Sequence, residues 1–153
     1  DMARLHGGEL LARRAQQGEA IVTLDGVART LSPEMTVIAD GGGAVGVGGV
    51  MGAASAEVSD STTDILLECA WFDPRRIRRT RGALGLSTDA SHRFERGVDL
   101  WGLPEALRRG IALILSVAGG RCEDAVDVWP TPSHPRTHSP PTSLARPSST
   151  SIR

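Results

Sequence analysis

Lysine and tyrosine are absent from this 153-residue chain, and aromatic residues make up only 3% of it. Scarce aromatic residues leave few platforms on which single-stranded bases could stack. All 17 basic residues are arginine, and the formal net charge is −1. This balance excludes an overall electrostatic attraction to nucleic acid or to a membrane, so attraction to a polyanion would have to come from a local concentration of charge.

Long hydrophobic runs are also missing. No apolar run reaches about 18 residues, the length that a membrane-spanning helix needs, and no signal peptide opens the chain. Because the first residue is Asp1 and not methionine, we expect the chain to begin inside a longer product or a truncated reading frame. The two cysteines, Cys69 and Cys122, lack the spacing of a metal site. We therefore expect a cytoplasmic protein in which both are small buried hydrophobic residues, rather than a disulfide or a metal pair.

The length suits one domain with a real core, and short apolar segments predict its strands. Asp25-Gly26 favours a tight turn that joins two of these strands into an antiparallel hairpin. The apolar run Ile65–Leu67 predicts a buried strand that ends near Glu68. The expected strands are 10–15, 20–24, 27–31, 36–39, 44–50, 64–70 and 125–129.

Two helices are predicted from their end signals and apolar spacing. Asp73-Pro74 is typical of a helix start, and Gly82–Gly85 of its end. A second helix is expected over Leu103–Ala118. The fold class is therefore α+β: residues 1–129 form one domain with a mixed or antiparallel sheet and two or three flanking helices. Residues 130–153, rich in Pro, Ser and Thr, are expected to form a disordered tail.

The segment 41–46 fits the GxGxxG pattern of dinucleotide-binding proteins. That function needs a helix directly after the glycines, whose N-terminus would bind the pyrophosphate. The following residues, Val47-Gly48-Gly49-Val50-Met51-Gly52, are poor helix formers, and no GK[ST] occurs. The sequence therefore predicts no nucleotide site here.

Three other features carry alternatives that the residues alone leave open. Glycines at 49 and 52 could let a ligand lie against the backbone, or could serve a bulge or close strand packing. Glu68 could face a pocket, or could pair with a nearby arginine. His92 invites a general-base role, although a helix-surface histidine bonded to a neighbouring acid is the more ordinary interpretation. Motifs typical of a nucleophilic enzyme, such as G-x-S-x-G or H-E-x-x-H, do not occur.

Three strings, GGVMGA, LLECAWFDPRRIRRT and GLSTDASHRFERGVD, resemble the beta subunit of bacterial phenylalanyl-tRNA synthetase. The resemblance is to its central tRNA-editing domain and covers roughly residues 1–130, with the order and spacing of the motifs kept. It implies hydrolysis of tyrosyl-tRNA(Phe) during protein synthesis. The implied partners are the acceptor end of tRNA(Phe) and the alpha subunit. ATP and Mg would act through other domains, and this domain is expected to need no cofactor.

The resemblance also implies an editing pocket formed by Gly49, Gly52, Glu68, Thr88 and Ala90. Glu68 matches the glutamate that recognises the ring hydroxyl of tyrosine, Thr88 would lie near the ester, and Ala90 would leave room for the ring. No catalytic side chain is expected: water would attack a positioned ester. Ala53 stands where the family usually has a second glycine, and a family histidine lies upstream of the position of Asp1. A non-catalytic RNA-binding module and an inactive structural remnant are the alternatives.

The arginine-rich helix that begins at Pro74 has two interpretations. Between Pro74 and Thr88 there is no acidic residue. Arg75, Arg78 and Arg79 could contact the phosphates of tRNA without reading its sequence, which would make binding strongly dependent on salt. The same side chains could instead form an ordinary solvated face.

Overall fold

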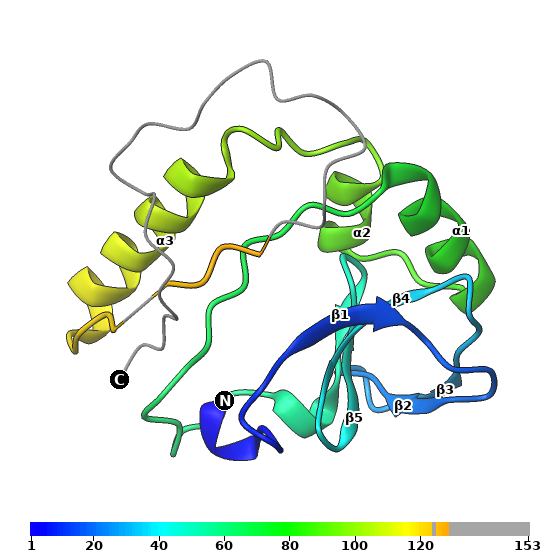
Figure 1. The fold of residues 1–153 in the computed structure, drawn as a ribbon, viewed down its shortest axis with the longest axis horizontal. Helices are drawn as coiled ribbons and strands as arrows, with labels where there is room; N and C mark the ends of the chain where they lie inside the picture. The colour runs from blue at the N-terminus through cyan, green and yellow to red at the C-terminus, as the bar shows by residue number, and fades with distance from the viewer. Residues whose placement is uncertain (124, 129–153) are drawn as a thin grey trace. The chain divides into compact units, whose positions relative to one another are not determined.

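The computed structural model describes residues 1–123 and 125–128, and it confirms the α+β class with antiparallel sheets and helices (Figure 1). The described chain divides into two compact units. The first unit comprises Asp1–Thr62 and Ala70–Leu100, and the second comprises Thr63–Cys69 and the residues from Trp101 onward. The tail expected over 130–153 lies outside the described residues.

Antiparallel strands make up the scaffold of the first unit. Its four-stranded sheet has the order β1-β4-β5-β6, and a separate hairpin pairs β2 with β3. The ladder between β4 and β5 has a bulge between Ile38 and Ala39. The bounds are Leu11–Arg14 for β1, Ala20–Val22 for β2, Ala28–Thr30 for β3, Thr36–Asp40 for β4, Gly43–Val47 for β5 and Met51–Gly52 for β6. Strands β1 to β5 each overlap a segment predicted as strand. The strand predicted over 44–50 ends at Val47, where a turn begins, and β6 was not predicted.

Two helices follow the sheet in the first unit, and they lie side by side in Figure 1. Helix α1, Pro74–Leu84, begins as predicted: the Asp73 carboxylate accepts hydrogen bonds from the backbone N–H groups of Arg75 and Arg76. It ends at Gly85, which has the left-handed φ of 64° that glycine tolerates. Helix α2, Asp89–Phe94, was not predicted as a separate element. Short 3₁₀ helices, η1 over Met2–Arg4 and η2 over Ala54–Ala56, complete the unit.

The hydrophobic core of the first unit joins the sheet to the helices. Ile77 of α1 is 1% exposed and Phe72, just before α1, is 8% exposed. The rings of Phe72 and Phe94 meet edge to face, with centroids 5.2 Å apart. The cluster consists of Ala15, Ile21, Leu31, Met35, Val37, Ala39, Val47, Val50, Ala53, Phe72, Ile77 and Leu86.

The second unit contains helix α3, Leu103–Ala118, with the bounds that its apolar spacing predicts. The Cys69 thiol donates a hydrogen bond to the carbonyl of Leu103 (Sγ–O 3.5 Å), and burial raises the pKa of that thiol. Cys69 and Cys122 are both free and half-buried. Within the described residues, no helix is long and apolar enough to cross a membrane, and no group of three or more potential ligand side chains could hold a metal ion.

Two strand predictions are wrong. Residues 64–70 form no strand and show only an isolated bridge at Ile65, and residues 125–128 are irregular; Trp129 lies outside the described part. A short apolar run indicates burial but cannot supply the neighbouring strand that a ladder requires. Leu67 instead lies near Gly110 of α3, where an added Cβ would be 3.6 Å from Leu67 Cδ2.

Candidate functional site

The five residues predicted for the editing pocket are divided between the two units. Gly49, Gly52, Thr88 and Ala90 belong to the first unit, whereas Glu68 belongs to the second. Within the first unit, a direct hydrogen bond from Thr88 to Val50 connects the loop that contains Gly49 to the residue that begins α2.

Gly49 lies in the tight connection between β5 and β6 and packs closely against the core. Its φ is +67°, which favours glycine, and an added Cβ would lie 2.7 Å from Ile77 Cδ1 and 2.9 Å from Phe72 Cδ2. At the neighbouring Gly48 an added Cβ would lie 2.7 Å from Phe72 Cε1. The groups that lie close to the glycine backbone here are side chains of the core. This supports the interpretation that the glycines serve close packing and not ligand binding.

Gly52 is likewise used by the fold. It pairs with Gly46 in the ladder between β5 and β6, and its carbonyl accepts a hydrogen bond from the backbone N–H of Leu24 (3.0 Å). An added Cβ would lie 3.3 Å from Leu24 Cδ1. A side chain at position 52 would therefore press on the β2–β3 hairpin.

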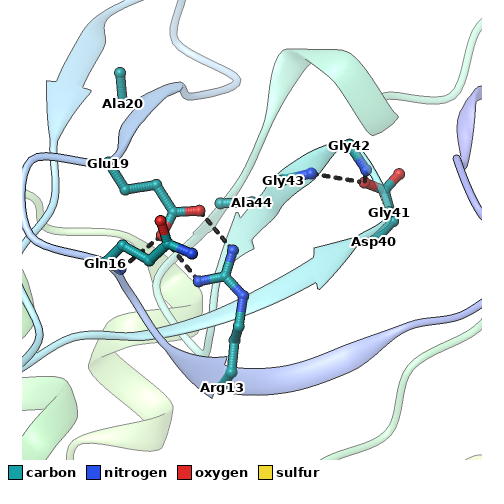
Figure 2. A pocket seen from close by; sticks show the side chains of 9 residues that line it. All are labelled: Arg13, Gln16, Glu19, Ala20, Asp40, Gly41, Gly42, Gly43 and Ala44. Atoms are coloured by element: carbon teal, nitrogen blue, oxygen red, sulfur yellow. Dashed lines mark hydrogen bonds and ion pairs between the residues drawn. The ribbon is translucent and has the colours of Figure 1, made fainter.

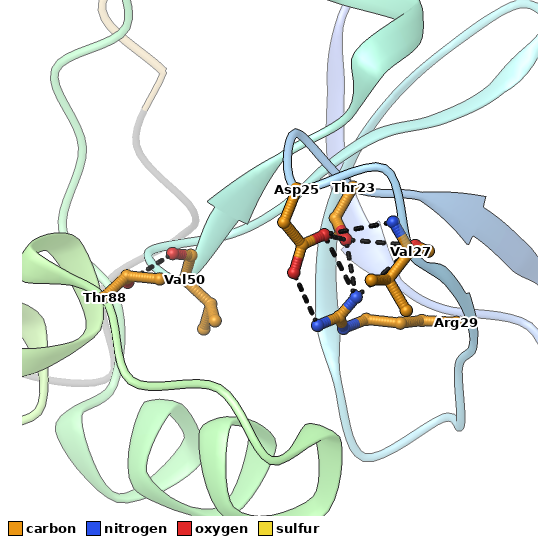
Figure 3. Close-up of polar contacts among 6 residues, drawn as sticks. All are labelled: Thr23, Asp25, Val27, Arg29, Val50 and Thr88. Atoms are coloured by element: carbon orange, nitrogen blue, oxygen red, sulfur yellow. Dashed lines mark hydrogen bonds and ion pairs between the residues drawn. The ribbon is translucent and has the colours of Figure 1, made fainter.

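Thr88 is the N-cap of α2, and its hydroxyl makes two hydrogen bonds. Oγ1 accepts from the backbone N–H of Ser91 (3.0 Å) and donates to the carbonyl of Val50 (2.6 Å), as Figure 3 shows for Val50. Ser91 is fully buried, and its hydroxyl accepts from the backbone N–H of Thr88, which completes a capping box. The Thr88 hydroxyl thus joins α2 to the connection after β5.

Ala90 and His92 both lie on the exposed surface of α2. The position of His92 confirms a helix-surface histidine, but in the described part of the chain its imidazole does not bond the neighbouring acid that this interpretation included. The backbone carbonyl of His92 accepts a hydrogen bond from Arg96 Nη1 (2.7 Å). The side chain of Ala90 is only a methyl group. Ala90 therefore leaves the surface beside the start of α2 free of a larger side chain.

Glu68 is exposed and, within its own unit as far as the chain is described, its carboxylate accepts no hydrogen bond and forms no ion pair. Desolvation by surrounding atoms raises the pKa of this carboxyl above its ordinary value. The residue as a whole is exposed, but the atoms that surround its carboxylate displace part of the water, and this is the cause of the raised pKa. Within the described part of the second unit Glu68 is therefore an unpaired acceptor, whereas the arginines near it in the sequence belong to the first unit.

Two groups of arginines can be distinguished on α1. Arg75, Arg78 and Arg79 are exposed, and in the described part of the chain their side chains make no hydrogen bond or ion pair. Arg81, in contrast, is held by the Glu95 carboxylate (Nη1–Oε2 2.9 Å) and by two further acceptors on residues 86 and 87. The first group is therefore free to meet a ligand.

A polar network on the β2–β3 hairpin fixes the tight turn at Gly26. The Asp25 carboxylate accepts hydrogen bonds from the Thr23 hydroxyl (2.6 Å) and from both Nη atoms of Arg29 (2.8 and 3.2 Å; Figure 3). The hydrogen bond from Thr23, with those from Val27 and Arg29, lowers the pKa of Asp25 despite some desolvation. Arg29 Nε is buried without a hydrogen-bond partner among the described residues, but the other polar atoms of this network bond to one another within the hairpin, and we assign them a structural role.

A cavity of about 520 Å³ lies where the glycines of the GxGxxG pattern are found (Figure 2). Gly41 and Gly42 form the turn between β4 and β5, so a strand follows them rather than a helix, as the sequence predicts. The Asp40 carboxylate accepts from the backbone N–H groups of His6 (2.8 Å), Gly42 (2.8 Å) and Gly43 (3.1 Å). The lining residues are Arg13, Gln16, Glu19, Ala20, Asp40, Gly41, Gly42, Gly43 and Ala44.

Two of the charged side chains in this cavity, Arg13 and Glu19, are paired with each other, whereas the Asp40 carboxylate is bound by backbone N–H groups. Arg13 donates to both carboxylate oxygens of Glu19 (2.7 and 2.9 Å), and this bond is the main reason why the pKa of Glu19 is lowered. Arg13, Glu19 and Asp40 were not predicted from the sequence. Arg13 meets Glu19 across the connection between β1 and β2, and Asp40 is bound by the backbone of His6 and of the β4–β5 turn, so no sequence motif marks the three residues. The acidic residue at the end of β4, directly before three glycines, is the one local signal that could have indicated such a turn.

Comparison with known proteins gives a consistent result along most of the chain. Residues 1–119 match the B3/4 domain family. The chain is 53% identical over 121 residues to the phenylalanine–tRNA ligase beta subunit of Moorella thermoacetica, which is 79% of this chain and 15% of that protein. It is 46% identical over 138 residues to that of Geobacter sulfurreducens (90% and 17%) and 45% identical over 126 residues to that of Zymomonas mobilis (82% and 16%).

The chain therefore spans about one sixth of the length of the relatives it matches (15–17%). The matched segment includes every residue predicted for the pocket and all of α1 and α2. Because the family match covers well over half of the chain, this chain belongs to the B3/4 domain family.

Proposed function

We propose that this B3/4 domain hydrolyses tyrosine that has been attached in error to tRNA(Phe), as the editing part of a phenylalanine–tRNA ligase beta subunit in the cytoplasm. Two observations support the proposal. The chain is similar to such beta subunits at 45–53% identity. Glu68 keeps an exposed carboxylate that is not neutralised within its unit, and this is the observation that carries the proposal.

The specificity would come from the hydrogen bond that Glu68 accepts. A carboxylate that accepts from a ring hydroxyl favours tyrosine over phenylalanine, because phenylalanine would leave the desolvated carboxylate without a partner. An apolar pocket would reject an added hydroxyl far less effectively. Tyrosyl-tRNA would therefore be hydrolysed and phenylalanyl-tRNA would be spared.

The chemistry would be attack by water on a positioned ester rather than by a side-chain nucleophile. Proximity and backbone dipoles would lower the barrier by orienting the ester and by stabilising the charge that develops on its carbonyl oxygen. Thr88 already donates to Val50, so we assign it the role of positioning α2 against the connection after β5. Ala90, small and exposed, would leave room for the aromatic ring.

The partners follow from the same proposal. The substrate would be the aminoacylated acceptor end of tRNA(Phe), and the chain would act together with an alpha subunit. Aminoacylation with ATP and Mg would take place in other domains, and hydrolysis in this domain would need no cofactor. The alternative of a non-catalytic RNA-binding module is favoured by one observation, the exposed arginines of α1.

Deacylation by a chimeric synthetase tests the proposal. Residues 1–128 of this chain would replace the matching segment of the complete Moorella thermoacetica ligase, and hydrolysis of purified tyrosyl-tRNA(Phe) would be followed with time. We expect hydrolysis well above the spontaneous rate, with phenylalanyl-tRNA(Phe) nearly untouched. Hydrolysis at the spontaneous rate with unchanged tRNA binding would contradict the editing function and favour the binding module.

A further inference from the structure

Positive charge is concentrated in one segment of an otherwise acidic chain. Residues 73–97, which contain α1 and α2, hold seven arginines and three acidic residues, a formal charge of +4 in a chain whose total is −1. The rest of the chain therefore carries −5. Such an asymmetry favours contact with a polyanion through this segment alone.

Helix α1 places part of this charge on its outer face. Arg75, Arg78 and Arg79 have the spacing i, i+3, i+4, which puts them on one side of the helix. Ile77 and Thr80 are buried on the opposite side. Because the side chains of the three arginines form no hydrogen bond or ion pair with any described residue, their guanidinium groups are available to a ligand.

The end of α2 adds to the same positive region. Glu95, at the C-cap of α2, is the acceptor for Arg81, and this hydrogen bond lowers the pKa of its carboxyl. Arg78 and Arg96 act electrostatically on the same carboxylate in the same direction, and Arg96 lies 3.8 Å from it (Nη1–Oε1). One carboxylate thus faces three arginines, so the region of contact between α1 and α2 keeps an excess of positive charge.

We propose that Arg75, Arg78 and Arg79 of α1, together with Arg96 after α2, form a surface that binds the phosphodiester backbone of RNA. We refer to these four residues as the arginine surface. The proposal rests on the proposed function for its choice of RNA, and it adds the element of the domain that would hold the polynucleotide.

The chemistry of the arginine surface favours backbone phosphates over bases and over lipid. Guanidinium groups match phosphate oxygens in pairs of parallel hydrogen bonds. The one aromatic ring in this segment, Phe94, packs edge to face on Phe72 of the core, so it offers no stacking platform. The outer face of α1 carries no apolar side chain that could insert into a membrane, because its residues there are Arg75, Arg78 and Arg79.

The proposal is tested by measuring how a tRNA(Phe) transcript without an attached amino acid binds to the full 153-residue chain at a series of salt concentrations. Arg78→Gln with Arg79→Gln removes two exposed charges that make no internal bond, so the variant should melt at the parental temperature. Arg108→Gln with Arg109→Gln on α3 is the charge-matched control. It removes the same charge from another exposed helix, and the Arg108–Glu105 pair that it also removes is exposed and contributes little to stability. We expect the first variant to weaken binding roughly tenfold and to reduce the slope of log K against log salt by about 0.7–0.9 for each phosphate that it no longer neutralises. The control should bind as the parent does.

Each other outcome contradicts the proposal. Unchanged affinity of the Arg78/Arg79 variant, or an equally weakened α3 control, would return α1 to an ordinary solvated face. Tighter binding to phosphatidylglycerol vesicles than to the transcript would indicate a membrane surface instead of RNA as the ligand. Because the transcript carries no ester, its binding does not depend on the editing pocket. Loss of hydrolysis with intact binding would count only against the proposed function. Failure of the parental chain to bind the transcript would count only against the arginine surface.

Discussion

The Thr88 hydroxyl donates a hydrogen bond to the carbonyl oxygen of Val50, and the two oxygens are 2.6 Å apart. Thr88 begins α2, and Val50 lies between β5 and β6, 38 residues earlier in the chain. Val50 is 1% exposed, so its carbonyl would otherwise have to find another partner in the core. This bond fixes the start of α2 against the loop that contains Gly49.

Removing the Thr88 hydroxyl should therefore destabilise the first unit. Thr88→Val keeps the shape of the side chain but leaves the Val50 carbonyl and the Ser91 N–H without their partner. We expect the free energy of unfolding, measured by urea denaturation, to fall by about 1–3 kcal/mol. Thr88→Ser retains the hydroxyl and should stay within about 0.5–1 kcal/mol of the parent. Equal destabilisation of the two variants would show that the methyl group, and not the hydrogen bond, matters.

Gly49→Ala should be strongly destabilising because it combines two costs. The backbone has a φ of +67°, and the new Cβ would lie 2.7 Å from Ile77 Cδ1 and 2.9 Å from Phe72 Cδ2. An alanine in this left-handed conformation lowers the free energy of unfolding by about 1–2 kcal/mol. The repacking that the new Cβ forces on the core lowers it by about 1–3 kcal/mol more. Gly82→Ala is the matched control, since Gly82 lies inside α1 with nothing within 4 Å of its Cβ position. That control should be stabilised by about 0.5–1 kcal/mol in thermal or urea unfolding. A neutral Gly49→Ala would contradict the close packing of this loop on the core.

Asp40 should make stability depend on pH. Desolvation by burial acts to raise the pKa of its carboxyl, but the hydrogen bonds from His6, Gly42 and Gly43 outweigh it, so the pKa is lowered. A lowered folded-state pKa stabilises the fold above the unfolded value of about 3.9, and this stabilisation disappears as the pH falls through the folded-state pKa. Asp40→Asn lacks this contribution.

At pH 7 we expect Asp40→Asn to be less stable by about 1–3 kcal/mol, because the amide offers one acceptor oxygen and turns a donor towards backbone N–H groups. The difference from the parent should shrink as the pH is lowered past the unfolded-state pKa. Urea denaturation at a series of pH values measures it, with the exposed Asp60→Asn as the control. A difference that stays constant across the acid range would show that the charge of Asp40 contributes nothing.

Local signals in the sequence predicted the elements that local interactions determine. The start of α1 at Asp73 and its end at Gly85 depend on hydrogen bonds within a few residues, so the residue types were sufficient. The turn at Gly26 is another such case, because its positive φ of 77° selects for glycine wherever the chain folds.

Interactions between distant segments were not visible in the sequence. The predicted strand over 64–70 failed because an apolar run specifies burial and not a hydrogen-bonded neighbour. No local pattern encodes where α1 and α2 meet each other and the sheet. The packing of Phe72 on Gly48 depends on this arrangement, and so does the pairing of Arg81 with Glu95. The resemblance supplied candidate pocket residues, but only the structure showed that Gly49 and Thr88 are engaged in packing and hydrogen bonding.

The role of Glu68 is the central claim. Its exposed carboxylate is available to accept a hydrogen bond from a tyrosine hydroxyl, and removing a charged hydrogen bond to a neutral group typically costs about 1.5–3 kcal/mol. In the chimeric synthetase, Glu68→Ala should therefore slow deacylation of tyrosyl-tRNA(Phe) roughly ten- to a hundredfold. Glu105→Ala, which removes an exposed carboxylate from α3 in the same unit, should deacylate at the parental rate.

The most direct measurement is the rate of deacylation of purified tyrosyl-tRNA(Phe) by the parental chimera and by Glu68→Ala, with phenylalanine charging measured on the same preparations. We predict a roughly ten- to hundredfold slower release of tyrosine with unchanged charging, about the effect of one charged hydrogen bond. Hydrolysis of tyrosyl-tRNA(Phe) by Glu68→Ala at the parental rate would contradict the assignment of Glu68 as the residue that recognises tyrosine.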